Sequence, residues 1–173
     1  MSDTTSLKLG FIGLGIMGAP MAGHLLAAGH RLFVHTRSQV PGALAGATAC
    51  ANAKEVADYF DKQYKGYACK TAADVARQAD IVFLMLPDTP DVQKVLFGDN
   101  GVASGLTAGK TVVDMSSISP IETKAFAQQI NALGCDYLDA PVSGGEVGAK
   151  AASLTIMVGG PETTFEKVKP LFE

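Results

Sequence analysis

The chain has 173 residues, of which 47% are hydrophobic and 18% charged, and its formal net charge is −3. These values are typical of one globular domain and argue against a nucleic-acid-binding protein, and the sequence contains no stretch of about 20 apolar residues that would span a membrane. Residues 1–6 lack the pattern of a secretory signal, and Cys50, Cys69 and Cys135 lack CxxC spacing, so we expect a cytoplasmic protein with reduced thiols and no metal site.

The first predicted unit is a strand, a glycine-rich loop and a helix. An apolar run at residues 9–12 predicts a buried strand, and the following helix is expected to bury Met17, Met21, Leu25 and Ala28. Between them lies the motif Gly13-Leu14-Gly15-Ile16-Met17-Gly18. Its first glycine suits a tight turn, its second allows a pyrophosphate to approach the backbone closely, and its third allows the helix to pack on the strand. The N–H groups at the helix N-terminus favour an anion there. The alternative is an ordinary turn that binds no ligand.

A second strand is predicted at residues 31–35, and the residues at its end bear on the choice of cofactor. A carboxylate about 20 residues past the glycines usually binds the adenosine ribose. This chain instead has His35-Thr36-Arg37-Ser38 there. An arginine between two hydroxyl groups suits a ribose 2′-phosphate, which favours NADP(H) while NAD(H) stays possible. The alternative is that Arg37 stacks on adenine without discriminating between the two.

The segment after the second strand contains a short internal similarity. Residues 49–57 and 68–76 share five identical positions out of nine. Either this is chance in an alanine-rich stretch, or a duplication adds an insertion at about residues 50–69. In the second case we expect an extra helix at residues 52–65, on one side of the sheet and away from the glycine loop.

The remaining elements continue the alternation of strands and helices. Strands are predicted at residues 81–86, 111–113 and 154–158. A helix begins after Ser119, its N-cap, with Glu122 as capping-box partner, and Gly134 ends it. We expect it to bury Ile121, Ala125, Ile130 and Leu133, and expect a final helix to bury Phe165, Val168 and Phe172. The predicted fold for residues 1–173 is α/β, a Rossmann-like doubly wound domain with a mainly parallel sheet.

Three polar loops follow predicted strands, where ligands bind in open α/β sheets. They are residues 86–88, 114–117 and 139–145. In the third, Ser143-Gly144-Gly145 offers a hydroxyl and consecutive backbone N–H groups to a carboxylate. Each loop alone is an ordinary turn, but together with the glycine motif they predict one crevice.

The sequence resembles the β-hydroxyacid dehydrogenase family, which includes 3-hydroxyisobutyrate dehydrogenases. The resemblance is carried, in order, by FIGLGIMGAPMAGHLLAAGH, FLMLPDTPDV, VVDMSSISPIETK and DYLDAPVSGGEVGA. The last two segments are most similar to the tartronate semialdehyde reductase branch.

The resemblance implies roles for individual residues. The pyrophosphate would be held by Phe11, Ile12, Gly13, Leu14, Gly15, Ile16, Met17 and Gly18. The nicotinamide side of the cofactor would contact Leu86, Pro87, Asp91 and Ser117. The carboxylate of a small 3-hydroxy or 3-oxo acid would be bound by Ser143, Gly144 and Gly145.

The chain also departs from the family pattern. The family's catalytic lysine would lie beyond Glu173, and neither Lys150 nor Lys167 matches it, so we expect no catalytic residue in this chain and an inactive domain. The family's all-helical second domain, which provides dimer contacts, is expected to be absent, with homo-oligomers formed through it in the full-length protein. Apolar surface near the last helix would then favour self-association. Residues 151–154 lack the glycine that is frequent there.

The predicted function is the cofactor domain of a reductase that interconverts tartronate semialdehyde and D-glycerate by hydride transfer. An alternative from another class is a nucleotide-dependent binding or regulatory module without catalytic activity. A Rossmann domain of unrelated activity is a third possibility, since fold does not determine function. We expect His24, His30 and His35 to be packing or surface residues.

Overall fold

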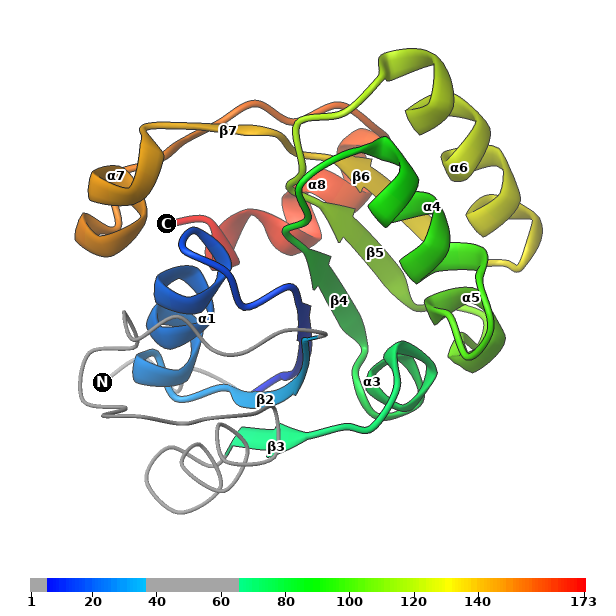
Figure 1. The fold of residues 1–173 in the computed structure, drawn as a ribbon, viewed down its shortest axis with the longest axis horizontal. Helices are drawn as coiled ribbons and strands as arrows, with labels where there is room; N and C mark the ends of the chain where they lie inside the picture. The colour runs from blue at the N-terminus through cyan, green and yellow to red at the C-terminus, as the bar shows by residue number, and fades with distance from the viewer. Residues whose placement is uncertain (1–5, 37–65) are drawn as a thin grey trace.

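A six-stranded parallel sheet forms the centre of the molecule (Figure 1). The computed structural model describes residues 6–36 and 66–173. Its elements are β1 (Lys8–Ile12), α1 (Gly18–Ala27), β2 (Arg31–His35), β3 (Gly66–Ala68), α3 (Ala72–Gln78), β4 (Ile81–Leu84), α4 (Thr89–Phe97), α5 (Val102–Gly105), β5 (Thr111–Asp114), α6 (Pro120–Ala132), β6 (Asp136–Asp139), β7 (Val142–Ser143), α7 (Gly145–Ala151), β8 (Thr155–Ile156), α8 (Glu162–Val168) and the 3-10 turn η1 (Lys169–Leu171).

The strand order is β3-β2-β1-β4-β5-β6, and each neighbouring pair is parallel. The order reverses between β1 and β4, the position at which ligands bind in doubly wound sheets. This arrangement confirms the predicted Rossmann-like fold. The glycine motif follows β1 directly and therefore lies at the reversal point.

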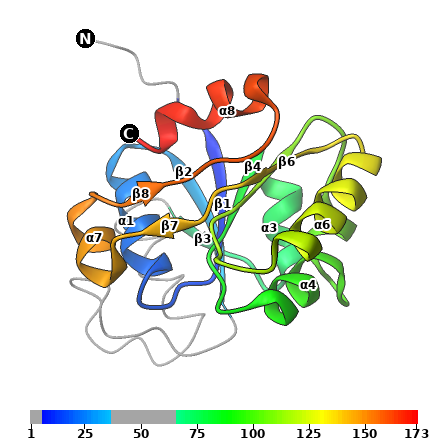
Figure 2. The ribbon, with the colours of Figure 1, turned by 90° about the horizontal axis from the view of Figure 1, so that it is seen from above.

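Helices cover both faces of the sheet, α1, α7 and α8 on one and α3 to α6 on the other (Figures 1 and 2). Strand residues alternate between the two cores, as the period of two requires. Phe83 of β4 belongs to the same core as Met21 and Val168, whereas its neighbour Val82 belongs to the core that contains Val75 and Phe126. Both cores are mainly apolar.

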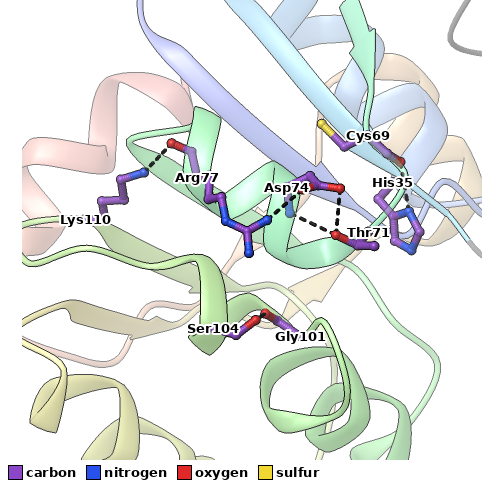
Figure 3. Close-up of polar contacts among 8 residues, drawn as sticks. All are labelled: His35, Cys69, Thr71, Asp74, Arg77, Gly101, Ser104 and Lys110. Carbon is purple, nitrogen blue, oxygen red and sulfur yellow. Dashed lines mark hydrogen bonds and ion pairs between the residues drawn. The ribbon is translucent and has the colours of Figure 1, made fainter.

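Helix α3 is short, and polar side chains stabilise both of its ends (Figure 3). At its start, the Thr71 hydroxyl accepts a hydrogen bond from the Asp74 amide at 3.1 Å, and the Asp74 carboxylate pairs with Arg77 at 2.7 Å. At its end, the Lys110 ammonium donates to the Arg77 carbonyl oxygen at 2.8 Å. A cation at the last turn complements the helix dipole and joins α3 to the start of β5.

The buried face of α6 differs from the prediction. Ile121 is 77% exposed and Leu133 44% exposed, whereas Thr123, Phe126 and Ile130 are buried. The spacing of three, four and seven residues among the buried positions is the helical one. The prediction was right for Ile130, only partly right for the half-buried Ala125, and wrong for Ile121 and Leu133, because it overlooked Thr123 and Phe126.

The predicted capping box of α6 is also incomplete. The Ser119 hydroxyl accepts from the Glu122 amide at 3.4 Å, as expected. The Ser119 amide, however, donates to the Thr89 hydroxyl at 3.1 Å, so the Glu122 side chain is not its partner. The contact joins the start of α6 to the start of α4 instead.

The C-terminal part is less regular than predicted. Within residues 154–158 only β8 is a strand, and it pairs antiparallel with β7 in a separate two-stranded sheet. Helix α8 ends at Val168, and Phe172 follows η1 rather than lying on the helix. The predicted helix at residues 52–65 lies outside the described residues, while residues 66–68 form the edge strand β3.

Ala152 ends α7 in the left-handed conformation, with φ +53° and ψ +41°. This is the segment where the sequence lacks a glycine. A left-handed alanine costs about 1 kcal/mol because its Cβ crowds the backbone. The chain reaches the turn into β8 despite that cost.

We expect Ala152→Gly to raise the free energy of unfolding by about 0.5–1 kcal/mol, because glycine adopts this conformation without strain. Urea denaturation measures the change. The matched control is Ala151→Gly, within the helix, which should lower it by about 1 kcal/mol. A loss of stability in Ala152→Gly would contradict the assignment of strain to this residue.

Candidate functional site

The three motif glycines have different surroundings. Gly13 has φ +97°, and a Cβ there would overlap the Met85 carbonyl oxygen. A Cβ on Gly18 would overlap the Gly13 carbonyl oxygen. A Cβ on Gly15, in contrast, would meet no heavy atom within 4 Å. The fold therefore requires glycine at 13 and 18, whereas at Gly15 the backbone faces open space that a ligand can fill.

Helix α1 begins beside this open space without a polar cap. Its N-cap residue, Met17, makes no side-chain hydrogen bond, and its first turn contains no acidic residue. Helices α3, α4 and α6 differ, since Thr71, Asp88 and Ser119 cap them. The positive end of the α1 dipole is thus left for another group, and an anion is the natural partner.

A cavity of about 290 Å³ lies at the carboxyl ends of β1, β2 and β4. Its lining residues are Ile12, Gly13, Leu14, Gly15, Ile16, Met17, Gly18, His35, Thr36, Met85, Leu86, Pro87 and Val95. The structure therefore brings the glycine loop together with Thr36, Leu86 and Pro87, as the sequence predicted. Phe11 is 1% exposed and lies in the core below, so any contact with a ligand would be through its backbone.

The end of β2 forms one rim of the cavity. The His35 carbonyl oxygen accepts a hydrogen bond from the Gly13 amide at 3.0 Å, and the His35 ring bonds through Nδ1 to the Cys69 carbonyl oxygen at 3.2 Å (Figure 3). His35 and Thr36 thus occupy a position where many dinucleotide sites have a carboxylate. The next two predicted residues, Arg37 and Ser38, lie outside the described residues.

The other predicted cofactor residues lie near the cavity but do not line it. Asp91 is half-buried in the first turn of α4, where its amide donates to the Asp88 carbonyl oxygen. Ser117 is exposed and follows Ser116, whose hydroxyl accepts from the Leu86 amide at 2.9 Å. Ser117 is therefore close in sequence to a residue that contacts the cavity wall.

The predicted carboxylate loop, residues 143–145, is exposed and runs from the last residue of β7 to the first residue of α7. Gly144 has φ +136°, and a Cβ there would lie 3.0 Å from the Leu154 side chain, so glycine is required. Helix α7 packs on α1, and the His24 ring bonds through Nε2 to the Ala149 carbonyl oxygen at 2.8 Å. The loop is thereby tied to the helix that begins at the glycine motif, although it does not line the cavity.

The remaining titratable residues of interest have structural partners. Lys150 pairs with Glu146 at 2.5 Å, and Lys167 donates to the Thr111 hydroxyl at 3.3 Å. His30 is buried and its Nδ1 accepts from the Leu7 amide at 3.3 Å, while burial lowers the pKa of the ring. His30 is thus a packing residue, whereas His24 is exposed and His35 half-buried, in line with the prediction that the three are packing or surface residues.

Residues 6–36 and 66–173 contain neither a metal-binding cluster nor a membrane-spanning helix. Within these ranges, no cluster of three or more histidine, cysteine or acidic residues is arranged to hold a metal ion. None of the helices described there combines the length and apolar character that crossing a membrane requires.

Comparison with known proteins gives consistent matches over almost the whole chain. The family model of the NAD binding domain of 6-phosphogluconate dehydrogenase matches residues 8–173. A 2-hydroxy-3-oxopropionate reductase of Escherichia coli (strain K12) is 54% identical over 96% of this chain and 51% of its own length. A 2-(hydroxymethyl)glutarate dehydrogenase of Eubacterium barkeri is 42% identical over 96% of this chain and 50% of its own length. The chain thus spans about half the length of these curated relatives.

A solved structure also matches the fold. Psf3 in complex with NADP+ and 2-OPP superposes with a TM-score of 0.78 at 30% identity, over 95% of this chain and 52% of that one. The topology described above is therefore shared with a protein that holds a nicotinamide dinucleotide.

We expect Gly15→Ala to lower the affinity for a nicotinamide dinucleotide at least about tenfold, because its Cβ would fill the space open to the ligand. The free energy of unfolding should stay within about 0.5 kcal/mol of wild type, since the new methyl group contacts nothing. Fluorescence titration and urea denaturation measure the two quantities.

Gly23→Ala is the matched control, since a Cβ at this α1 position also meets no atom within 4 Å. It should bind the dinucleotide as wild type does and gain about 0.5–1 kcal/mol of stability from its helix propensity. Unchanged affinity in Gly15→Ala would show that the ligand does not approach this backbone.

Proposed function

The chain belongs to the family of NAD-binding domains represented by 6-phosphogluconate dehydrogenase, and on that premise we propose that it is the cofactor-binding part of a β-hydroxyacid dehydrogenase that reduces tartronate semialdehyde to D-glycerate with NADPH. The observation that carries the proposal is the open backbone at Gly15 beside the uncapped start of α1. A pyrophosphate fits that combination of space and positive potential.

The proposal assigns the cavity wall to cofactor binding. The loop at residues 13–18 holds the pyrophosphate through its backbone, and Leu86 and Pro87 contact the nicotinamide side. Asp91, in α4 after β4, and Ser117, after β5, are assigned to the same side. Bound there, the nicotinamide exchanges a hydride with the substrate, and the protein contributes orientation and exclusion of water.

Residues 143–145 are the proposed substrate carboxylate site. Their support is the combination of an exposed hydroxyl with two glycine amides in a loop that the packing of α7 on α1 attaches to the cofactor side. Backbone N–H groups of this kind bind carboxylates without needing a cation. The two curated relatives described above are named for acids that carry a carboxylate, which this loop would suit.

We assign the general acid of the reaction to the portion of the relatives beyond the half that this chain matches. The supporting observation concerns two lysines, Lys150 next to the proposed substrate loop and Lys167 on α8. Lys150 and Lys167 both have partners, and neither lines the cavity. Homo-oligomer formation through that same portion is part of the proposal.

The proposed cofactor is NADP(H). Its support is the sequence His35-Thr36-Arg37-Ser38 at the end of β2, which offers a cation and hydroxyl groups in place of a carboxylate. The NADP+ bound to Psf3 is consistent with a fold of this type accepting the 2′-phosphate.

Titration of NADPH and NADH into the protein, followed by nicotinamide fluorescence, tests this choice. NADPH should bind at least about tenfold more tightly, and Arg37→Ala should remove most of that difference while leaving NADH binding unchanged. Lys124→Ala, an equal change of charge on α6, is the control and should alter neither affinity. Equal affinities of the wild type for both cofactors would refute the NADP(H) assignment.

Reduction of tartronate semialdehyde by the full-length enzyme tests the substrate. The competing substrate is 2-formylglutarate, the oxo acid that corresponds to 2-(hydroxymethyl)glutarate. We expect a higher kcat/KM for tartronate semialdehyde, and the reverse order would transfer the assignment to the larger acid.

A further inference from the structure

Three polar residues are buried together at the carboxyl edge of the sheet, outside the cavity lining. Asp114, at the end of β5, is fully buried, and Ser116 and Tyr137 are 1% and 4% exposed. A buried carboxyl group is strongly destabilising unless hydrogen bonds compensate it. The burial of the Asp114 carboxyl group therefore calls for a reason beyond packing.

The carboxyl group of Asp114 has hydrogen-bond donors on both oxygens. The Tyr137 hydroxyl donates to Oδ2 at 2.9 Å, and the Ser116 amide donates to Oδ1 at 3.0 Å. Burial raises the pKa of the Asp114 carboxyl, and these hydrogen bonds oppose the rise. The Tyr137 hydroxyl and the Ser116 amide therefore offset part of the cost of burying this carboxyl group.

Ser116 connects Asp114 to the cavity wall. Its amide is held by Asp114, and the lone pairs of its hydroxyl oxygen can accept from another donor. That donor is the Leu86 amide, at 2.9 Å. The last ladder bond between β4 and β5 is the one from the Met115 amide to the Leu84 carbonyl oxygen, so Ser116 continues the pairing where the strands end.

Leu86 in turn lies against the glycine loop. It lines the cavity, and its Cδ2 would lie 3.0 Å from a Cβ built on Gly13. The preceding residue, Met85, has its carbonyl oxygen at the same glycine. A shift of the backbone at residues 85–86 would therefore change the shape of the cavity beside Gly13.

We propose that Tyr137 is a positioning residue for dinucleotide binding, which acts through Asp114 and Ser116 to hold Leu86 against the glycine loop. This role rests on the proposed function, because it requires that the cavity bind a dinucleotide. Tyr137 itself does not line the cavity, so its effect on the ligand is indirect.

The first measurement reads the positioning without any ligand. Amide hydrogen exchange by NMR should show the Leu86 amide exchanging at least about tenfold faster in Tyr137→Phe and in Ser116→Ala than in wild type. The Met115 amide, bonded to the neighbouring strand, should keep its rate. Equal acceleration at both amides would indicate general loosening and overturn the proposal.

The second measurement is NADPH titration of the same variants. Tyr137→Phe should weaken binding about fivefold and Ser116→Ala about tenfold. The double variant should bind like Ser116→Ala alone, because both changes act through one hydrogen bond to Leu86. Additive losses in the double variant would show that Tyr137 acts by another route.

Ile130→Val is the matched control, a buried change on α6 over the same face of the sheet. It should lower stability in urea and leave the NADPH affinity unchanged. Wild-type affinity in Tyr137→Phe would refute this proposal while leaving the proposed function intact. If the wild type binds no dinucleotide while the variants show the expected faster exchange of the Leu86 amide, the proposed function and the role of Tyr137 in binding are refuted. The hydrogen-bonded connection from Tyr137 to Leu86 is not refuted by that result.

Discussion

Two close backbone contacts determine where the cavity forms. Gly13 lies against the Met85 carbonyl oxygen, and Gly18 lies against the Gly13 carbonyl oxygen, so neither position has room for a side chain. These contacts bring the end of β1, the end of β4 and the start of α1 to one point. Since β1 and β4 are the strands at which the sheet order reverses, the same point is where a doubly wound fold opens to a ligand.

Polar groups at this edge are distributed unevenly, and the pattern suits an anionic ligand with a neutral wall. The starts of α3, α4 and α6 are capped by side chains, whereas the start of α1 is not. The one buried carboxyl group nearby, Asp114, points its oxygens at Tyr137 and Ser116. The start of α1 thus keeps its positive dipole end free for a ligand, and the Asp114 carboxyl group has donors of its own.

Most of the fold could be predicted from the sequence because its central strands are continuous apolar runs and its turns are marked by glycine. Predictions failed where elements are short or weakly amphipathic. In α6, Ile121 is exposed and Thr123 is buried, which the composition of the helix did not indicate. In the C-terminal part, the expected strand at residues 154–158 is reduced to β8, because its partner β7 is only two residues long.

The site was predictable only where one local motif contains it. The glycine loop met that condition, whereas the hydrogen-bonded chain from Tyr137 to Leu86 did not. Its members lie up to 51 positions apart, and the parallel register of β4, β5 and β6 brings them together. Nothing in the spacing of a tyrosine, an aspartate and a serine indicates such a contact before the strands are paired.

The central claim is that the cavity at the glycine loop, and not another part of the surface, binds the dinucleotide. A second cavity of about 210 Å³ lies between α1, α7 and η1, with an apolar lining that includes Leu25 and Phe172. Amide chemical-shift mapping on addition of NADP+ separates the two. We expect the largest shifts at residues 13–18 and at Leu86. Shifts confined to the lining of the second cavity would contradict the account.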